Sequence, residues 1–481
     1  MLTHEQKERI GFKYIINLIE PVSPYGKEAL RCAYPASPGQ EEELSRKLQN
    51  IEKAIISLEQ KGASYTKLEE LLVQTRDVRN SVSRIGDVLS EVDLFEIKRY
   101  LLQLKQIVPL FNEINKEAKY NDITIENTVS ALKILDPENT KIATFHISSK
   151  SFPHLAEIRK EKSEIEKKLR AELCDEEKAE LTAKRVSIAS KEQKEEKKAA
   201  LQLSKELEPW REVLLQNARA IGRIDLTIQK AKLAIKYKTC LPKIGGDSIS
   251  FTEMTNPQIN DILAESGKKF TPLSIELRKG TTVITGANMG GKSVALKALA
   301  LNILLIHHGF YPFAEKASCP LLDSIYLISD DLEAVDRGLS SFGGEVVKLQ
   351  EVLNEAVNTK TIILLDEFAR GTNPTEGKAI AGAVCAYMNK QESYTAMTTH
   401  YDDVAGLAGA HYQVAGLRKM ELTESLMEEM QSLQVSERVT KIAKYMDYGL
   451  LKVSPGEKLP EDAVNICKLL GVEKGILDLL G

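Results

Sequence analysis

The sequence contains no closely spaced pair of cysteines. Its 481 residues include six cysteines, and no two of them form a C-x-x-C pair. The six are Cys32, Cys174, Cys240, Cys319, Cys385 and Cys467. This scatter argues against a disulfide framework and against a cysteine-based zinc site, so we expect reduced thiols, as in a cytosolic protein.

The sequence also lacks a hydrophobic segment long enough to cross a membrane. Its longest apolar run, residues 294–306, contains Lys297 and Asn302 and is shorter than the roughly 20 residues that a transmembrane helix needs. Residues 1–9 are polar and do not resemble the apolar core of a signal peptide. These absences predict a soluble, cytoplasmic protein without a membrane partner.

An excess of charge of either sign is missing as well. The chain has 65 Lys and Arg residues against 69 Asp and Glu residues, which gives a net charge of −4. Such a balance provides no overall attraction to nucleic acid, so a DNA site would have to be a local patch. The length allows two to four domains with ample hydrophobic core.

Glycine is almost absent between residues 41 and 133, where apolar residues recur at helical spacing. After residue 240, short β-branched runs alternate with helical stretches, which is typical of an α/β domain with a largely parallel sheet. The runs are 248–251, 281–285, 361–365 and 395–398. We therefore predict an all-helical domain (residues 1–238), an α/β domain (239–418) and a small C-terminal helical module (419–481).

Residues 155–208 of the helical part carry dense charge of both signs. Opposite charges three and four residues apart favour long, solvent-exposed helices. We expect a helical arm made of an antiparallel pair, with its turn near residues 174–181 or near residues 187–190. A disordered charged linker is the alternative. Because basic and acidic residues nearly cancel, no DNA-gripping surface is evident here.

A glycine-rich loop lies between the predicted strand 281–285 and the helix 294–306. It has the pattern G-x-x-x-x-G-K-S and is made of Gly286, Ala287, Asn288, Met289, Gly290, Gly291, Lys292 and Ser293. Glycines let the backbone approach phosphate oxygens, and the start of a helix attracts anions. The pattern predicts that Lys292 reaches the β- and γ-phosphates of ATP and that Ser293 binds Mg²⁺. A chance glycine-rich turn is the alternative.

Two further predicted strands end in residues suited to hydrolysis. The apolar run 361–365 leads into Asp366 and Glu367, and unpaired carboxylates at such a place would be costly without a function. We expect Asp366 to hold Mg²⁺ through water and Glu367 to polarise the attacking water. His400 follows the run 395–398, and we expect it to sense the γ-phosphate from the same sheet edge. His307 and His308, after an apolar helix, are predicted to be structural.

Taken together, these motifs resemble the MutS family. The run Asn-Met-Gly-Gly-Lys within residues 285–293 resembles the sequence pattern that is particular to that family's Walker A motif. Residues 340–345 resemble its signature segment, 365–372 its Walker B motif and following loop, and 399–401 its switch histidine. The loop of residues 371–377 (Gly-Thr-Asn-Pro-Thr-Glu-Gly) is closer to the MutS2 branch than to mismatch-repair MutS.

The resemblance implies an ABC-type P-loop ATPase domain preceded by helical levers. It also implies a homodimer in which ATP lies between the Walker motifs of one subunit and Ser340 and Ser341 of the other. Phe270 occupies the position of the family's adenine-stacking aromatic residue, although a core phenylalanine opening a strand is the alternative. Residues 461–471 are similar to the family's dimerising helices, and residues 23–30 resemble its lever region.

Departures from the family limit what the resemblance implies. Because the helical lever begins almost at Met1, we expect no mismatch-reading domain, and we expect neither a nuclease-type domain nor nuclease activity. One hypothesis is an ATP-driven clamp on duplex or branched DNA. The chain is also similar to short MutS-like ATPases associated with lysine 5,6-aminomutase. That resemblance implies the alternative, an ATP-dependent reactivating chaperone for this cobalamin-dependent enzyme, without DNA binding. The sequence pI near 6.1 and the neutral arm favour that alternative.

Overall fold

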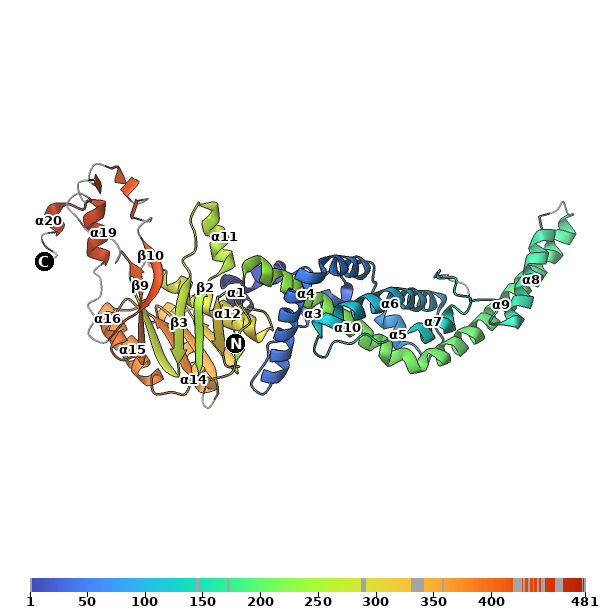
Figure 1. Ribbon diagram of the computed structural model, residues 1–481, viewed down its shortest axis with the longest axis horizontal. Coiled ribbons are helices and arrows are strands. Elements are labelled where there is room, and N and C mark those ends of the chain that lie inside the picture. Colours follow the sequence, from blue (N-terminus) through green and yellow to red (C-terminus); the bar gives the residue numbers. More distant parts are fainter. Residues whose placement is uncertain are drawn as a thin grey trace. The chain divides into compact units, whose positions relative to one another are not determined.

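The structure, a computed structural model, divides into two compact units (Figure 1). Unit 1 contains residues 1–19, 34–49 and 232–481, and unit 2 contains residues 20–33 and 50–231. The described residues are 2–143, 147–170, 174–286, 291–329, 341–356 and 359–417, with parts of 426–479.

Unit 2 is built from helices, as its scarcity of glycine predicts. Two helices have residues in both units, namely α4, which kinks at Lys61, and α10. Helix α6 begins with a capping box between Ser90 and Asp93. The helices are α3 (Pro24–Arg31), α4 (Glu41–Val73), α5 (Arg79–Ser83), α6 (Glu91–Ala118), α7 (Val129–Leu135), α8 (Pro153–Lys168), α9 (Asp175–Leu207), the 3₁₀ helix η1 (Glu208–Trp210) and α10 (Arg211–Tyr237).

Helices α8 and α9 form the antiparallel pair that the charge pattern predicts. Ile158, Ile165 and Ile188 make a small buried seam between them. Ion pairs cross the seam from Arg159 to Glu192 at 3.2 Å and to Glu196 at 2.7 Å, from Lys162 to Glu192 at 2.5 Å and from Arg185 to Glu166 at 3.0 Å. The connection lies between residues 168 and 175, so it reaches only the start of the first predicted range (174–181), most of which lies inside α9. The alternative turn at 187–190 is wrong, because those residues also lie inside α9.

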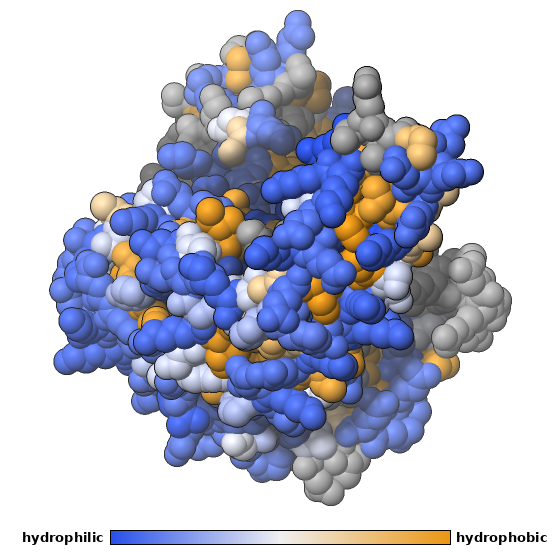
Figure 2. All heavy atoms as spheres, turned by 90° about the vertical axis from the view of Figure 1, so that its right-hand side faces the viewer, coloured by the Kyte–Doolittle hydropathy of each residue, from blue (hydrophilic) through white to orange (hydrophobic). Residues whose placement is uncertain are grey.

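Polar side chains cover most of the face shown in Figure 2. The sequence explains this surface in unit 2, because the charges of α8 and α9 outnumber their apolar residues. The ion pairs between the two helices join side chains of opposite charge. No helix in the described part of the chain has the length and apolar character to cross a membrane.

A buried carboxylate fixes α3 to α10 within unit 2. Asp225 of α10 is fully buried, and its Oδ2 accepts hydrogen bonds from the Ser23 N–H at 2.7 Å and the Ser23 hydroxyl at 2.6 Å. Its Oδ1 accepts from the Val22 N–H at 3.2 Å. The helices approach closely, since a Cβ on Gly26 would lie 2.1 Å from Asp225 Oδ2 and one on Gly222 would lie 2.6 Å from the Tyr25 carbonyl oxygen. Asp225 is therefore central to this packing.

Unit 1 contains the predicted parallel sheet and a second, smaller sheet. The six-stranded sheet has the order β10-β9-β4-β8-β7-β6, and only β10 is antiparallel to its neighbour. The smaller sheet has the order β1-β5-β2-β3. The strands are β1 (Lys243–Ile244), β2 (Ser248–Met254), β3 (Leu273–Arg278), β4 (Gly280–Thr285), β5 (Lys316–Cys319), β6 (Ser324–Ile328), β7 (Thr361–Asp366), β8 (Tyr394–Thr398), β9 (Ala410–Gly416) and β10 (Asp447–Lys452).

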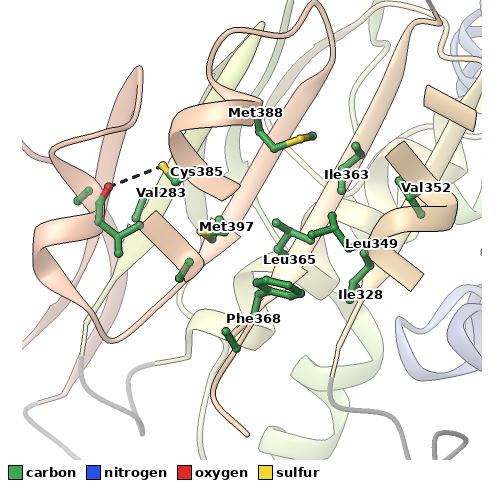
Figure 3. Packing of buried hydrophobic residues seen from close by; sticks show 14 residues of the cluster. Val283, Ile328, Leu349, Val352, Ile363, Leu365, Phe368, Cys385, Met388 and Met397 are labelled. Carbon is green, nitrogen blue, oxygen red and sulfur yellow. Dashed lines mark hydrogen bonds between the residues drawn. The ribbon is translucent and has the colours of Figure 1, made fainter. Parts of the chain in front are cut away.

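Helices of unit 1 bury the apolar faces of the large sheet. Leu349 and Val352 of α14 and Met388 of α15 pack over Ile363 and Met397 of the central strands (Figure 3). Helix α12 is apolar on all sides and is buried along β7 and β8. The helices are α1 (His4–Arg9), α2 (Phe12–Asn17), α11 (Pro257–Glu265), α12 (Lys292–His307), α14 (Ser341–Ala356), α15 (Pro374–Met388), α16 (Asp402–Ala405), α19 (Asp462–Leu470) and α20 (Lys474–Leu477).

Two features of unit 1 differ from the predicted boundaries at 238 and 418. Residues 1–19 pack with the α/β unit instead of the helical unit, because Ile10 is fully buried there and Gln6 Nε2 donates to the Leu327 carbonyl oxygen at 2.8 Å. The predicted C-terminal helical module contains strand β10, which extends the large sheet beside β9. The functional division of the chain at these boundaries stays a prediction.

His307 is a structural residue, as predicted. Its side chain is buried, its Nδ1–H donates to the Ile303 carbonyl oxygen at 2.9 Å, and its Nε2 accepts from the Leu322 N–H at 2.9 Å. The backbone N–H of Leu322 leaves no room for a proton on Nε2, so this contact requires the neutral ring. Burial lowers the pKa of His307 below its ordinary value.

This histidine is expected to make folding stability sensitive to acid. Below about pH 6.5 the unfolded chain binds a proton on the ring, whereas the folded ring stays neutral, so the free energy of unfolding falls. Above that pH the contribution is fully present. Melting temperatures between about pH 8 and about pH 5 should therefore drop more steeply in the wild type than in His307→Gln. Equal slopes for the two proteins would contradict this assignment.

Candidate functional site

Three parallel strands bring the predicted motifs to one edge of the large sheet. In the register, Ile284 of β4 pairs with Thr398 of β8, and Asp366 of β7 also pairs with Thr398. The residues after these three strands therefore emerge side by side. They are the loop that begins at Gly286, the carboxylates of β7, and the segment that contains His400. The carboxyl edge of parallel strands is where open α/β sheets bind ligands.

The two described ends of the loop between β4 and α12 are glycines in a backbone conformation that favours glycine. Gly286 has φ +135° and Gly291 has φ +88°, a region that favours glycine. A Cβ on Gly286 would lie 3.1 Å from Val414 Cβ, so the loop also packs closely on β9. Gly291 is the N-cap of α12, where free N–H groups attract anions. Residues 287–290, and with them Asn288, Met289 and Gly290, lie outside the described part of the chain.

Lys292 connects the loop to the second motif. Its Nζ donates to the Gly286 carbonyl oxygen at 2.8 Å and lies 3.2 Å from Glu367 Oε1. The side chain is only 2% exposed. A buried ammonium group at the start of a helix provides a concentrated positive charge, which suits a phosphate group. The structure thus brings together Lys292 and Glu367, two residues that the sequence assigns to one site.

Ser293 and Asp366 meet beneath the loop. The Ser293 hydroxyl donates to Asp366 Oδ1 at 2.9 Å, and the Thr398 hydroxyl donates to the same oxygen at 2.8 Å. A hydroxyl and a carboxylate are oxygen ligands of the kind that Mg²⁺ prefers, with phosphates and water completing its shell. Among the described residues there is no group of three or more His, Cys, Asp or Glu that could hold a metal by itself. The pair therefore suits a magnesium ion that arrives with a nucleotide.

Glu367 lies in a turn with unusual backbone geometry. Its φ is +50°, which is rare for a residue with a side chain. Its N–H donates to the Thr398 hydroxyl at 2.8 Å. Its side chain is largely buried, and its Oε2 accepts from Arg370 Nη1 at 2.5 Å. The carboxylate is thus held at a fixed place beside the loop.

His400 follows β8 and is exposed at the same edge. Its ring lies 4.0 Å, centroid to centroid, from the ring of Tyr401. Desolvation lowers the pKa of His400, and the charge of Glu367 opposes that shift while Lys292 and Arg370 add to it. The ring is therefore mostly neutral at pH 7 and can both donate and accept a hydrogen bond.

Other predicted site residues receive less support. Phe270 is buried, and its N–H donates to Asn260 Oδ1 at 3.3 Å before β3 begins, which favours the core alternative over a base-stacking role. Ser340 lies outside the described residues. Ser341 is the first residue of α14, and nothing is described of its side chain.

Sequence reasoning missed three residues at this edge. A Cβ on Gly291 would lie 3.3 Å from Tyr448 Cδ1, which places an exposed aromatic ring of β10 beside the loop. Arg370 pairs with Glu367, and the buried Glu345 of α14 accepts from the Ala369 N–H at 2.9 Å. Arg370 lies within the motif of residues 365–372, and Glu345 lies within the segment 340–345. Tyr448 lies beyond the predicted domain end at residue 418, and no sequence motif marks it as a site residue.

Comparisons with known proteins agree with this geometry. Residues 282–470 match the family model of MutS domain V. The Endonuclease MutS2 of Caldanaerobacter subterraneus subsp. tengcongensis is 29% identical over 218 residues, which cover 44% of this chain and 27% of that protein. The DNA mismatch repair protein MutS of Thermus aquaticus is 34% identical over 199 residues, or 41% of this chain and 23% of that protein.

A third relative extends the similarity further along this chain. The DNA mismatch repair protein MutS of Haloquadratum walsbyi is 30% identical over 263 residues, which cover 54% of this chain and 26% of that protein. The chain thus spans about a quarter of the length of these relatives. The family model matches residues of unit 1, and most of each relative is unmatched.

Proposed function

Because this chain belongs to the MutS family through its domain V, we propose that it is an ATPase that hydrolyses ATP to ADP and phosphate. The observation that carries the proposal is the meeting of Lys292, Ser293, Asp366 and Glu367 at the ends of two strands of one sheet. These residue types in this arrangement can hold a triphosphate, its metal ion and the attacking water.

Each residue has a distinct part in this proposal. Lys292 binds the β- and γ-phosphates, and the N–H groups at the start of α12 add to the positive field. Ser293 and Asp366 hold Mg²⁺, which, when bound, neutralises charge that develops on the phosphates. Glu367 accepts a proton from the attacking water. His400 lies at the same edge, where its neutral ring can hydrogen-bond to the γ-phosphate.

The nucleotide base is proposed to lie near Tyr448. This ring lies beside Gly291 and is exposed, so one of its faces is available for stacking on a base. Phe270 remains a weaker candidate because its side chain is buried.

We further propose that two copies of the chain complete each site. Helix α14 exposes Val346 and Val347, each 41% accessible, on the helix that begins at Ser341. An exposed apolar pair beside the predicted trans segment suits contact with a second copy, which would supply Ser340 and Ser341. Residues 461–471 of the C-terminal module are proposed to strengthen the homodimer.

The substrate that the ATPase acts on is proposed to be duplex or branched DNA. Two of the relatives reported above are named DNA mismatch repair protein, and one is named an endonuclease. The matched part covers 27% of that endonuclease, so its name does not carry nuclease activity to this chain. Nucleotide-driven opening and closing of the helical levers would grip and release the DNA.

The alternative partner is a protein, namely a cobalamin-dependent lysine 5,6-aminomutase that the ATPase would reactivate. None of the relatives named above carries such a description. The observation that favours it is the balance of charge on α8 and α9, where Arg159, Lys162 and Arg185 pair with glutamates across the two helices.

Measuring ATP hydrolysis with and without DNA tests these proposals. We expect duplex or branched DNA to stimulate hydrolysis, and DNA affinity to fall steeply as salt rises. If no DNA form binds at about 100 mM salt and none changes the rate, the DNA proposal is wrong and the protein partner is favoured. If the chain neither binds nor hydrolyses ATP, the ATPase proposal itself fails.

A further inference from the structure

The carboxylate of Glu367 is held by a different cation on each of its two oxygens. Lys292 Nζ lies 3.2 Å from Oε1, and Arg370 Nη1 lies 2.5 Å from Oε2. The two cations differ in their surroundings, since Lys292 is 2% exposed and Arg370 is 58% exposed. While both contacts persist, a cation occupies one acceptor site on each oxygen.

Nucleotide binding would break only one of these contacts. If Lys292 binds phosphates, as proposed above, its Nζ turns away from Glu367 and leaves Oε1 free on the side where the phosphates lie. The contact between Arg370 and Glu367 should persist, because it uses Oε2 and because the Arg370 guanidinium lies toward solvent. Oε1 would then be the atom that accepts the proton, while Oε2 stays anchored.

The backbone between the two residues is built to hold this pair. Glu367 has φ +50° and Ala369 has φ +64°, two non-glycine residues in the left-handed region within one turn. Such a turn persists only when its surroundings determine it. Here the Thr398 hydroxyl accepts from the Glu367 N–H, Glu345 accepts from the Ala369 N–H, and the Arg370 N–H donates to the Glu367 carbonyl oxygen at 3.2 Å.

We propose that Arg370 is a positioning residue for ATP hydrolysis, an inference that rests on the proposed function. It fixes Glu367 Oε2 through a charge-assisted hydrogen bond, so that Oε1 faces the attacking water once Lys292 has left. In this role Arg370 acts through its contact with Glu367 and not through the nucleotide or the metal. Its effect therefore falls on the chemical step and not on ATP binding.

Arg370→Ala is expected to lower kcat about 10- to 100-fold, because a small misplacement of a reacting group costs that much in rate. The KM and the Kd for ATP should not change. Arg370→Lys restores part of kcat, since an ammonium group can hold Oε2 with a single bond but lacks the planar fork. Because Arg370 is exposed, neither substitution is expected to affect folding, and thermal melting checks this.

Lys378→Ala provides a matched control. Lys378 lies on α15, the helix that follows the turn of residues 367–370. It forms an exposed ion pair with Asp403 in the same unit. Exposed pairs of this kind contribute little to stability, so this variant should keep the wild-type kcat. A loss of rate in both variants would mean that any change near α15 disturbs the site, and the specific role of Arg370 would be refuted.

A double variant tests whether Arg370 acts through Glu367. In single-turnover measurements, Arg370→Ala should have no further effect in a Glu367→Gln background, because residues that act as a unit are not additive. Independent, additive losses overturn the inference, as does a wild-type kcat in Arg370→Ala or a raised Kd for ATP. A wild-type protein without ATPase activity overturns instead the proposed function on which the inference rests.

Discussion

Glu367→Gln is expected to lower ATP turnover about 100-fold or more while leaving ATP binding intact. The amide has nearly the shape of the carboxylate but cannot accept a proton from the attacking water. It also loses the charge that attracts Lys292 and Arg370, which frees Lys292 for the phosphates. Steady-state phosphate release measures turnover, and binding of a fluorescent ATP analogue measures affinity.

The same variant should reveal the proposed homodimer. If ATP completes a site shared by two copies and is not hydrolysed, the dimer accumulates, and gel filtration in ATP should show it. Glu376→Gln is the matched control, because Glu376 is exposed in the first turn of α15. Turnover at the wild-type rate in Glu367→Gln would show that the base is another residue.

Asp225→Ala is expected to destabilise unit 2 by about 3 kcal/mol or more. The substitution leaves the Ser23 N–H, the Ser23 hydroxyl and the Val22 N–H without their acceptor, and each buried unsatisfied donor is costly. Asp225→Asn should lose less, because the amide keeps one acceptor oxygen. Gly26→Ala should also destabilise, because its Cβ would lie 2.1 Å from Asp225 Oδ2.

Urea denaturation measures the loss of stability, and hydrogen exchange locates it. We expect faster exchange in residues 20–33 and 211–231, while the β-strands of unit 1 keep their protection. Asp87→Ala is the control, since Asp87 is exposed in the same unit and should change stability by less than about 0.5 kcal/mol. A loss below about 1 kcal/mol in Asp225→Ala would show that this contact does not fix α3 to α10.

Several parts of the site could be predicted because their signal is local. The run 281–285 had to form a strand, the glycines after it had to form a turn, and Lys292 had to begin a helix. A buried run that ends in Asp366 and Glu367 gives a similar local signal. Once the strands are parallel, their ends share an edge, so the meeting of these residues follows from the sequence.

Predictions failed or stayed silent where a contact joins distant segments. The sequence gives no sign that Gln6 reaches Leu327, and therefore residues 1–19 were assigned to the helical domain. Strand β10 was missed for the same reason, because its place beside β9 depends on the sheet that it joins. Tyr448 could not be predicted as a site residue without that strand.

The sequence by itself determined which residues we propose to bind phosphate, hold magnesium and activate water. Each of these properties belongs to a residue type at the end of a short strand or the start of a helix, and neighbouring residues are enough to specify it. The tertiary structure alone decided how those groups are held. Lys292 and Arg370 divide the oxygens of Glu367 between them, and Thr398 and Glu345 maintain a turn that its own residues disfavour. Such contacts depend on the register of strands and the packing of helices that are far apart in the chain, which no local pattern encodes.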